Sequence, residues 1–361
     1  MRNKAVVLLV VLSSLAAASV ELTPADRDGP LRLHNEFPFT SVFLATAPLD
    51  ARIPTRERLE VGLSVANIYA IPYAAITTPA GQAWLKEPEK STFDQAGLAE
   101  WAAGNGGRSV YLADTEQIRL DLTYTRPFGR RALVEVEVPL KAYSGGVLDP
   151  LIYGWHSALG FADAYRHHTP NNVQQVFFAR GNESLALNAA RGPRLGDTTV
   201  RGLYQFWRSG ERGMSLAGSA TLKLPTGSSS QLMGSGYVEG GLGLHATQEL
   251  GRLTLYGTAG FNLHPGWAAI PSARVRSAFD LHGGAQWRFG DRFAVLGALA
   301  LYGSPLDEGG RRSLGQPASL YSIAGRWSWD RYSVEFGMLE NIVRNNNSHD
   351  FGLYSKLRVN F

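Results

Sequence analysis

Cysteine is absent from the 361 residues of this sequence. A chain without thiols can form neither disulfide bonds nor a thiolate metal site, so its stability must come from packing and hydrogen bonds. Beyond residue 20 the sequence also has no apolar run of the roughly 18 residues that a transmembrane helix needs. If the protein resides in a membrane, it must cross that membrane with β-strands.

Charge of one sign and catalytic motifs are also scarce. The formal net charge is +4 and no basic run stands out, so we expect no nucleic-acid partner. The eight histidines are scattered, and the sequence has neither a G-x-S-x-G elbow nor an H-E-x-x-H zinc motif. We therefore predict no enzymatic activity, no cofactor and no metal site. The alternative is a lipid-acting outer-membrane hydrolase, which would need a nucleophile, a His base and an orienting group within hydrogen-bond reach.

The first residues have the layout of a secretory signal peptide. The segment "MRNKAVVLLVVLSSLAAASV" begins with Arg2 and Lys4 and continues with an apolar run. It ends in small residues, with Ala16 and Ala18 as an A-x-A cleavage signal. The sequence thus predicts a signal peptide over residues 1–18 and export to the cell outer membrane of a Gram-negative bacterium.

Alternation of apolar and polar residues recurs along most of the chain. In residues 117–124, Leu120 and Leu122 fall on one face, and Arg119 and Asp121 fall on the other. This period of two predicts strands with one apolar and one polar face. Further runs of the same kind lie at 59–65, 134–140, 197–207, 214–224, 237–248, 253–263, 279–288, 293–302, 320–329, 332–342 and 351–361.

Short turns and long connections alternate between these runs. Turns such as 250–252 are short, whereas 142–195 is a long segment. Bacterial outer-membrane barrels have short periplasmic turns, long external loops and an even number of strands. We predict an all-β, antiparallel, up-and-down transmembrane barrel of about 12 strands over residues 58–361, with 142–195 as a large external segment. If 173–180 and 184–190 were also barrel strands, the count would be about 14.

The polar face of these strands supplies the residues that are predicted to line the lumen. Their signs nearly balance, which fits either paired networks in a narrow barrel or a weakly selective pore. Glycines such as Gly241 and Gly260 also fall on strands and indicate bending or close approach of another backbone. The lumen candidates are Arg119, Asp121, Glu135, Glu137, Arg201, Lys223, Glu239, Asp280, His282, Arg288, Arg326, Glu335, Lys356 and Arg358.

Two segments do not follow the strand pattern. Residues 19–57 are rich in proline and have no long alternating run, so we expect a periplasmic lead-in or a plug in the lumen. Residues 143–161 predict a helix, with Asp149 as its N-cap and Pro150 at its first position. This helix would lie outside the barrel or in its mouth, where Asp149, Trp155 and His156 are candidates for a lid.

The chain ends on the alternating segment "FGLYSKLRVNF", which we expect to close the barrel against the first strand. Aromatic residues gather near the short turns, and Phe361 joins them. This distribution is typical of the aromatic girdle at a membrane interface, so outer-membrane lipid is an expected partner. The terminal aromatic residue resembles the C-terminal signature that the outer-membrane assembly machinery reads, which makes that machinery a second expected partner.

Several phrases resemble one protein family. They are "GPLRLHNEFPF" (29–39), "YSGGVLDPLIYGWHSALGF" (143–161), "LGDTTVRGLYQFW" (195–207), "LKLPTG" (222–227) and "LENI" (339–342). The sequence is similar in these places to the proteobacterial family known as domain of unknown function 3187. The resemblance implies an outer-membrane location and brings no activity with it.

Three functions remain open at this point. The first is a channel, or a barrel that binds or transports a small-molecule solute of unknown identity. The second is a structural or envelope-assembly barrel without a substrate, and the third is the hydrolase. An open lumen would favour transport, a lumen packed with Arg–Glu pairs would favour the structural function, and a clustered Ser–His–carboxylate site would favour the enzyme.

Overall fold

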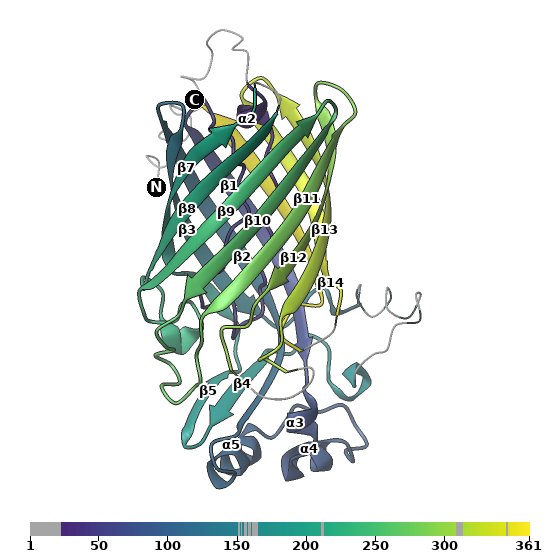
Figure 1. Cartoon of the computed structure of the whole chain (residues 1–361). Helices are drawn as coiled ribbons and strands as arrows, with labels where there is room; N and C mark the ends of the chain where they lie inside the picture. The colour runs from purple at the N-terminus through teal and green to yellow at the C-terminus, as the bar shows by residue number, and fades with distance from the viewer. Residues whose placement is uncertain are drawn as a thin grey trace, which may run out of the picture.

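Twelve antiparallel strands close into a barrel in the computed structural model, as the sequence predicted (Figure 1). The structure describes residues 23–361 except 151, 153, 155, 156, 158, 159, 161–164, 211, 212, 308–312, 344 and 345. The barrel closes where the first strand pairs with the last, in a register that runs from Arg58 opposite Asn360 to Asn67 opposite Phe351. A closed barrel leaves no unpaired strand edge for lipid to meet.

The barrel strands are β1 (Arg58–Ala70), β2 (Ser109–Phe128), β3 (Ala132–Ser144), β7 (Thr198–Arg208), β8 (Met214–Leu224), β9 (Glu239–Leu250), β10 (Leu253–Leu263), β11 (Ala278–Arg288), β12 (Phe293–Tyr302), β13 (Ala318–Trp329), β14 (Tyr332–Asn341) and β15 (Phe351–Asn360). Short turns join them at one end and long connections at the other, in strict alternation. We call these the short-turn end and the long-loop end.

The segments that could have raised the count to 14 are strands, but they lie outside the barrel wall. They form β4 (Gln175–Arg180) and β5 (Glu183–Leu187), which pair with each other. β4 pairs with the first residues of β2, beyond the part of β2 that pairs with β3. Strands of six and five residues are too short to cross a bilayer, which takes about 9–11. A third short strand, β6 (Arg191–Leu195), pairs with the end of β3.

Three short helices form a small body at the long-loop end together with β4 and β5 (Figure 1). They are α3 (Tyr73–Ile76), α4 (Pro79–Trp84) and α5 (Gln95–Gly104). Trp84, Phe93 and Leu98 are buried in its core. Two short 3-10 helices, η1 (Arg166–His168) and η2 (Ser229–Gln231), also lie in the long connections. No helix in the described part of the chain is long and apolar enough to span a membrane.

The two faces of each barrel strand differ as the alternation predicted. On β11, Phe279 and Leu281 are 70% and 53% exposed, whereas Asp280 and His282 are 2% and 8% exposed. The exposed residues are apolar and the buried residues are polar, which is the reverse of a water-soluble sandwich. This arrangement suits a barrel with lipid outside and a polar interior.

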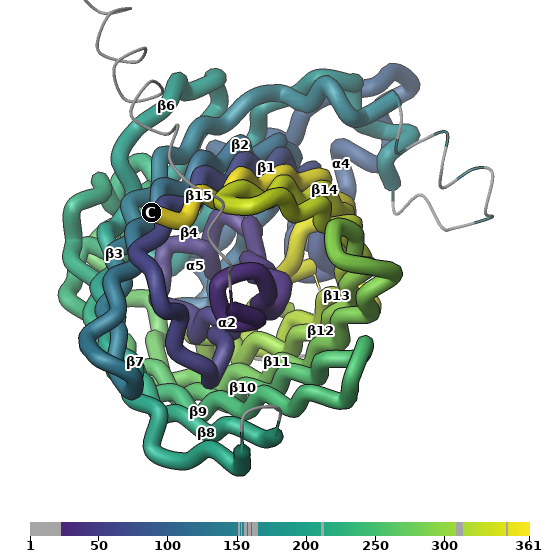
Figure 2. The backbone as a smooth tube through the Cα atoms, turned by 90° about the horizontal axis from the view of Figure 1, so that it is seen from above, coloured from purple at the N-terminus to yellow at the C-terminus, as the bar shows by residue number. Residues whose placement is uncertain are grey.

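Residues 23–57 lie inside the barrel and form what we call the N-terminal hairpin. The hairpin begins with α2 (Pro24–Arg27), which lies in the centre of the barrel when it is viewed from the short-turn end (Figure 2). One arm then runs to the long-loop end, and the other returns to β1. The two arms meet again at the short-turn end, where Thr55 Oγ1 donates a hydrogen bond of 2.7 Å to Asp26.

Candidate functional site

The predicted lumen residues are buried or half-buried on the inner side of the wall: Arg119, Asp121, Glu135, Glu137, Arg201, Lys223, Glu239, Asp280, His282, Arg288, Arg326, Glu335, Lys356 and Arg358. The polar positions of the strand pattern therefore do face one shared interior. Most of these side chains pair with another charge, either across neighbouring strands or with the N-terminal hairpin. Asp280 and His282 are the exceptions, because no salt bridge joins either of them to a described residue.

Ion pairs between strands form a continuous patch on β2, β3 and β7. Arg201 donates to Glu135 at 2.6 Å and to Glu137 at 3.1 Å. Arg119 joins the same patch through Glu137 at 2.8 Å and Asp121 at 2.7 Å. The five residues come from three neighbouring strands, so cross-strand register brings their charges together. All of these residues belong to the wall, and the hairpin joins the patch where Arg32 Nη1 donates to Glu135 at 3.0 Å.

A second set of bonds holds the hairpin near the short-turn end. Arg326 donates to Glu335 at 2.5 Å and to the backbone carbonyl of Gly29 at 2.9 Å. Arg358 donates to Glu60 at 2.6 Å and to the carbonyl of Asp28 at 2.8 Å. Both arginines thus bind a wall carboxylate and the hairpin backbone at once.

The tip of the hairpin is held through its backbone near the long-loop end. Lys141 Nζ donates to the carbonyl of Ser41 at 2.7 Å, and Lys223 Nζ donates to the carbonyl of Val42 at 3.0 Å. The backbone N–H groups of Leu44 and Thr46 donate to carboxylates of Glu239 and Asp280, at 2.6 and 2.7 Å. These four wall charges bind a hairpin that, from residue 28 to residue 57, contains no helix or strand.

Aromatic side chains seal the mouth of the barrel around the same tip. The ring centroid of Phe39 lies 5.8 Å from that of Tyr111, 5.5 Å from that of Phe178 and 6.2 Å from that of Trp267. The three partners come from β2, β4 and the connection between β10 and β11. All four side chains are buried, so the long loops converge on the hairpin tip and cover it.

His349, in the connection between β14 and β15, fixes the first arm just before the tip. Its Nδ1 accepts a hydrogen bond of 3.3 Å from the backbone N–H of Glu36. Burial lowers the pKa of His349 to about 4, so the ring is neutral at pH 7 and can accept this bond.

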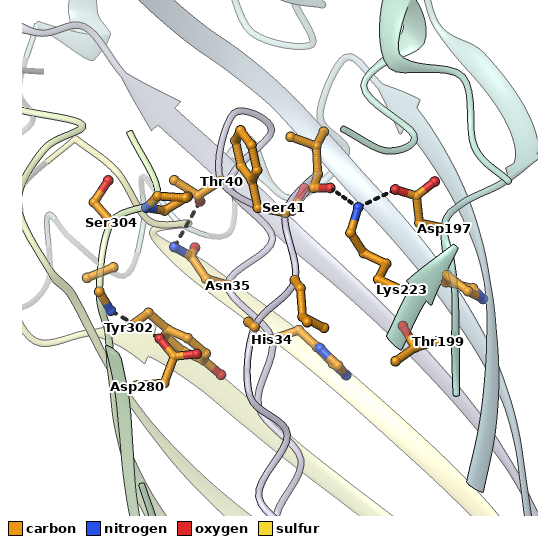
Figure 3. A pocket seen from close by; sticks show the side chains of 18 of the residues that line it. His34, Asn35, Thr40, Ser41, Asp197, Thr199, Lys223, Asp280, Tyr302 and Ser304 are labelled. Atoms are coloured by element: carbon orange, nitrogen blue, oxygen red, sulfur yellow. Dashed lines mark hydrogen bonds and ion pairs between the residues drawn. The ribbon is translucent and has the colours of Figure 1, made fainter. Parts of the chain in front are cut away.

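In the described part of the chain, two of the lumen cavities lie beside the first arm of the hairpin. The larger, of about 80 Å³, lies beside the hairpin tip and we call it the tip cavity. Figure 3 shows Asp280 and Tyr302 on one side of the hairpin and Asp197, Thr199 and Lys223 on the other. The smaller, of about 60 Å³, lies against β1 and β15 and we call it the side cavity. His34 and Glu137 line both cavities.

One group of side chains at this boundary has the composition of a metal site. His34, Asp121 and Glu137 can each offer one ligand atom, and these atoms lie within 4.8 Å of one another. Arg119 already pairs with both carboxylates, and Arg201 pairs with Glu137. A divalent cation would have to enter beside two guanidinium groups, so the arrangement suits an ion-pair network better than a metal site.

The described residues also contain a serine–histidine contact, which bears on the hydrolase alternative. His245 Nε2 lies 2.9 Å from Ser219 Oγ, and His245 Nδ1 lies 3.0 Å from Thr258 Oγ1. A hydroxyl group thus occupies the position that an orienting carboxylate takes in a catalytic triad. None of these three residues lines the tip cavity or the side cavity.

The predicted lid is only partly described. Asp149 and Pro150 are helical, and Trp155 and His156 lie outside the described residues. Asp149 was expected to cap this helix, but its carboxylate accepts bonds from Asn67 Nδ2 and the backbone N–H of Asn172, both at 2.9 Å, and pairs with Arg166. It therefore ties the end of β1 to the segment that follows β3.

Among the wall residues that hold the tip, Lys223, Glu239 and Asp280 were predicted as lumen residues, and Lys141 was missed. Lys141 could have been found, because it continues the polar register of the run 134–140 by one step. The hairpin residues Arg32, His34 and Glu36 gave no such signal, since no periodic pattern surrounds them.

The comparisons with known proteins agree with this architecture. The family profile described as "Protein of unknown function (DUF3187)" matches residues 89–361. The chain belongs to the DUF3187 family. The matched region starts after the N-terminal hairpin and β1. The search of curated proteins finds no match.

Among solved structures, the fold is similar to the COG4313 outer membrane channel from Pseudomonas putida F1. The TM-score is 0.53 at 10% identity, over 88% of this chain and 100% of that chain. The KdgM porin gives 0.39 at 10% identity, over 70% and 99% of the two chains. The translocator domain of the autotransporter NalP from Neisseria meningitidis gives 0.41 at 7% identity, over 85% and 89%. At 10% identity, the similarity to the COG4313 channel shows only that the two proteins share the fold of an outer-membrane barrel.

Proposed function

We propose that this protein is an outer-membrane channel for a small solute and that the N-terminal hairpin closes it. The observation that carries this proposal is the position of the hairpin, which fills the interior of a barrel whose wall is complete without it. The wall pairs strand to strand around the whole ring. The hairpin is held by wall side chains that bind its backbone, by ion pairs of Arg32 and Arg52 with wall carboxylates, and by the aromatic seal. None of these contacts is part of a strand pair, so the hairpin can move without breaking one.

A structural barrel without a substrate is the second candidate, and one observation favours it. The wall residues Arg119, Glu137 and Arg201 pair with one another and occupy part of the lumen. If such pairs filled the lumen by themselves, removal of the hairpin would open no path.

A variant without the hairpin arms distinguishes the two candidates. Arg52 Nη2 lies 3.9 Å from Asp28 Oδ2, so the arms are close together at their base. Residues 30–48 can therefore be replaced by two glycines while both arm ends stay in place. We expect liposomes that contain this variant to swell in glycine but not in the trisaccharide raffinose, and liposomes with the whole protein to swell in neither. Absence of swelling in glycine by a correctly folded variant would favour the structural barrel.

A further inference from the structure

The cations that line the tip cavity are not equivalent. Arg119 and Arg201 each pair with two carboxylates, and Lys223 pairs with Asp197 and lies 3.2 Å from Glu239. Lys141 lines the same cavity and is only 2% exposed. Among the described residues no carboxylate lies within 4 Å of Lys141 Nζ, and its one hydrogen bond goes to the Ser41 carbonyl at 2.7 Å.

A buried ammonium group whose partner is neutral has no opposite charge to offset its lost hydration. Burial of a charge is costly unless an opposite charge and hydrogen bonds replace the lost water. An ammonium group has three donors, and the Ser41 carbonyl takes one of them. The Ser41 carbonyl accepts a charge-assisted bond, but it is neutral and brings no negative charge to offset the buried ammonium. A carboxylate in the tip cavity would therefore be a better partner for Lys141 than the carbonyl that it binds now.

The size of the tip cavity limits what it can hold. One buried water needs about 10–15 Å³, so about 80 Å³ has room for roughly five to eight waters. A small organic acid of the size of malonate fills a comparable space.

We infer that the tip cavity binds a small organic carboxylate through Lys141. This inference names the solute class of the proposed channel and rests on that proposal. It also connects binding to the hairpin, because the lysine that receives the carboxylate is the one that holds the carbonyl of Ser41. A carboxylate that takes over Lys141 removes one of the bonds that hold the tip.

Calorimetric titration of the mature protein in detergent tests this inference. The probes are malonate and malonamide, which share a shape and differ in charge. We expect malonate to bind in a one-to-one ratio and malonamide to show no measurable binding. Lys141→Gln keeps a donor for Ser41 and removes the charge. It should weaken malonate binding by about 10- to 100-fold, the change that matches loss of one hydrogen bond to a charged group.

Lys356→Gln is the matched control, because Lys356 is a lumen lysine that lines the side cavity and lies 3.1 Å from Glu335. Its malonate affinity should stay within about twofold of the original value. If Lys141→Gln does not fold, Lys141→Met takes its place. The inference is overturned if the unaltered protein does not bind malonate, if malonamide binds equally well, or if the Lys141 variant keeps its affinity. Swelling of liposomes by the hairpin-deleted variant is independent of these titrations, so the channel proposal and the ligand class can fail separately.

Discussion

Individual charged residues show how this barrel keeps a polar interior. Arg201 is buried in the lumen and pairs with both Glu135 and Glu137. The attraction within such a buried pair is largely offset by the loss of hydration, so these pairs add little net stability. Removal of one partner is nevertheless costly, because it leaves a buried charge without compensation. The pairs therefore contribute more to the specificity of side-chain pairing in the lumen than to the stability of the barrel.

At the same scale, Leu244 tests the assignment of the outer face. It lies near the middle of β9, and its side chain is 63% exposed. Arginine at a lipid-facing position near the bilayer midplane costs about 2–4 kcal/mol. Leu244→Arg should therefore make folding into lipid vesicles less favourable by about that amount. Leu244→Met, the control, should change it by less than about 1 kcal/mol, and an equal effect of the two substitutions would mean that this face does not meet lipid.

Phe39 tests the aromatic seal. Truncation of a buried phenylalanine to alanine typically costs about 3–5 kcal/mol, because contacts are lost and a cavity remains. In Phe39→Ala this loss weakens the packing of the hairpin tip against the long loops. We expect faster hydrogen exchange of the backbone amides in residues 37–46, while amides of the barrel strands stay protected. Phe279→Ala is the control, because that side chain is 70% exposed on the outer face. Unchanged exchange in Phe39→Ala would show that the seal does not hold the tip.

At the scale of elements, the strands were predictable, whereas the sequence left a periplasmic lead-in and a plug in the lumen open for residues 19–57. Along β9 or β11, successive side chains point alternately to lipid and to the lumen, so apolar and polar residues alternate over the whole strand. The wall surrounds the hairpin on all sides, so the hairpin has no apolar face opposite a polar one. Its sequence therefore shows no periodic alternation. β4 and β5 carry strand-like sequences, but their pairing with the outer part of β2 depends on contacts that the sequence does not reveal.

Gly260 on β10 lies where the hairpin approaches the wall closely. A Cβ atom on Gly260 would lie within 2.5 Å of the Cβ atom of Thr46, so the hairpin or the strand would have to move. The strand is held by both neighbours, and the hairpin moves more readily. Gly260→Val should therefore displace the returning arm and make the channel leak, as measured by ion current across a planar bilayer. Gly257→Val on the same strand is the control, because nothing lies within 4 Å of its Cβ position.

The end of β15 leads to a prediction about assembly. Phe361 follows the strand, its side chain is 45% exposed, and its backbone N–H donates to the Glu57 carbonyl at 2.9 Å. We propose that its ring is recognised by the outer-membrane assembly machinery. Phe361→Ala should then reduce the heat-modifiable, folded barrel in cell membranes severalfold, while refolding of the purified chain in detergent stays within about twofold. Phe289→Ala, an exposed aromatic at a short turn, should change neither, and an equal loss in cells and in detergent would indicate a folding defect instead.

For the whole molecule, the sequence predicted the barrel and its polar interior, but not the contacts between the wall and the hairpin. The 12-strand barrel and its polar interior follow from period-two alternation and from the order of short and long connections. The role of Lys141 could not be read in this way, since it depends on a hairpin carbonyl from residue 41 meeting a strand 100 residues further along the chain. Contacts between a non-periodic segment and a wall are set by three-dimensional shape, and only the folded structure shows them.

The central claim is that the hairpin, and not the wall, closes the lumen. Single-channel recording in planar bilayers tests it most directly, with the whole protein compared with the variant in which two glycines replace residues 30–48. We predict that the whole protein stays closed at low voltage and that the variant gives discrete, long-lived open steps, with both proteins showing the same heat-dependent shift on gels. Discrete steps of equal size from both proteins, or no steps from a folded variant, would contradict the claim.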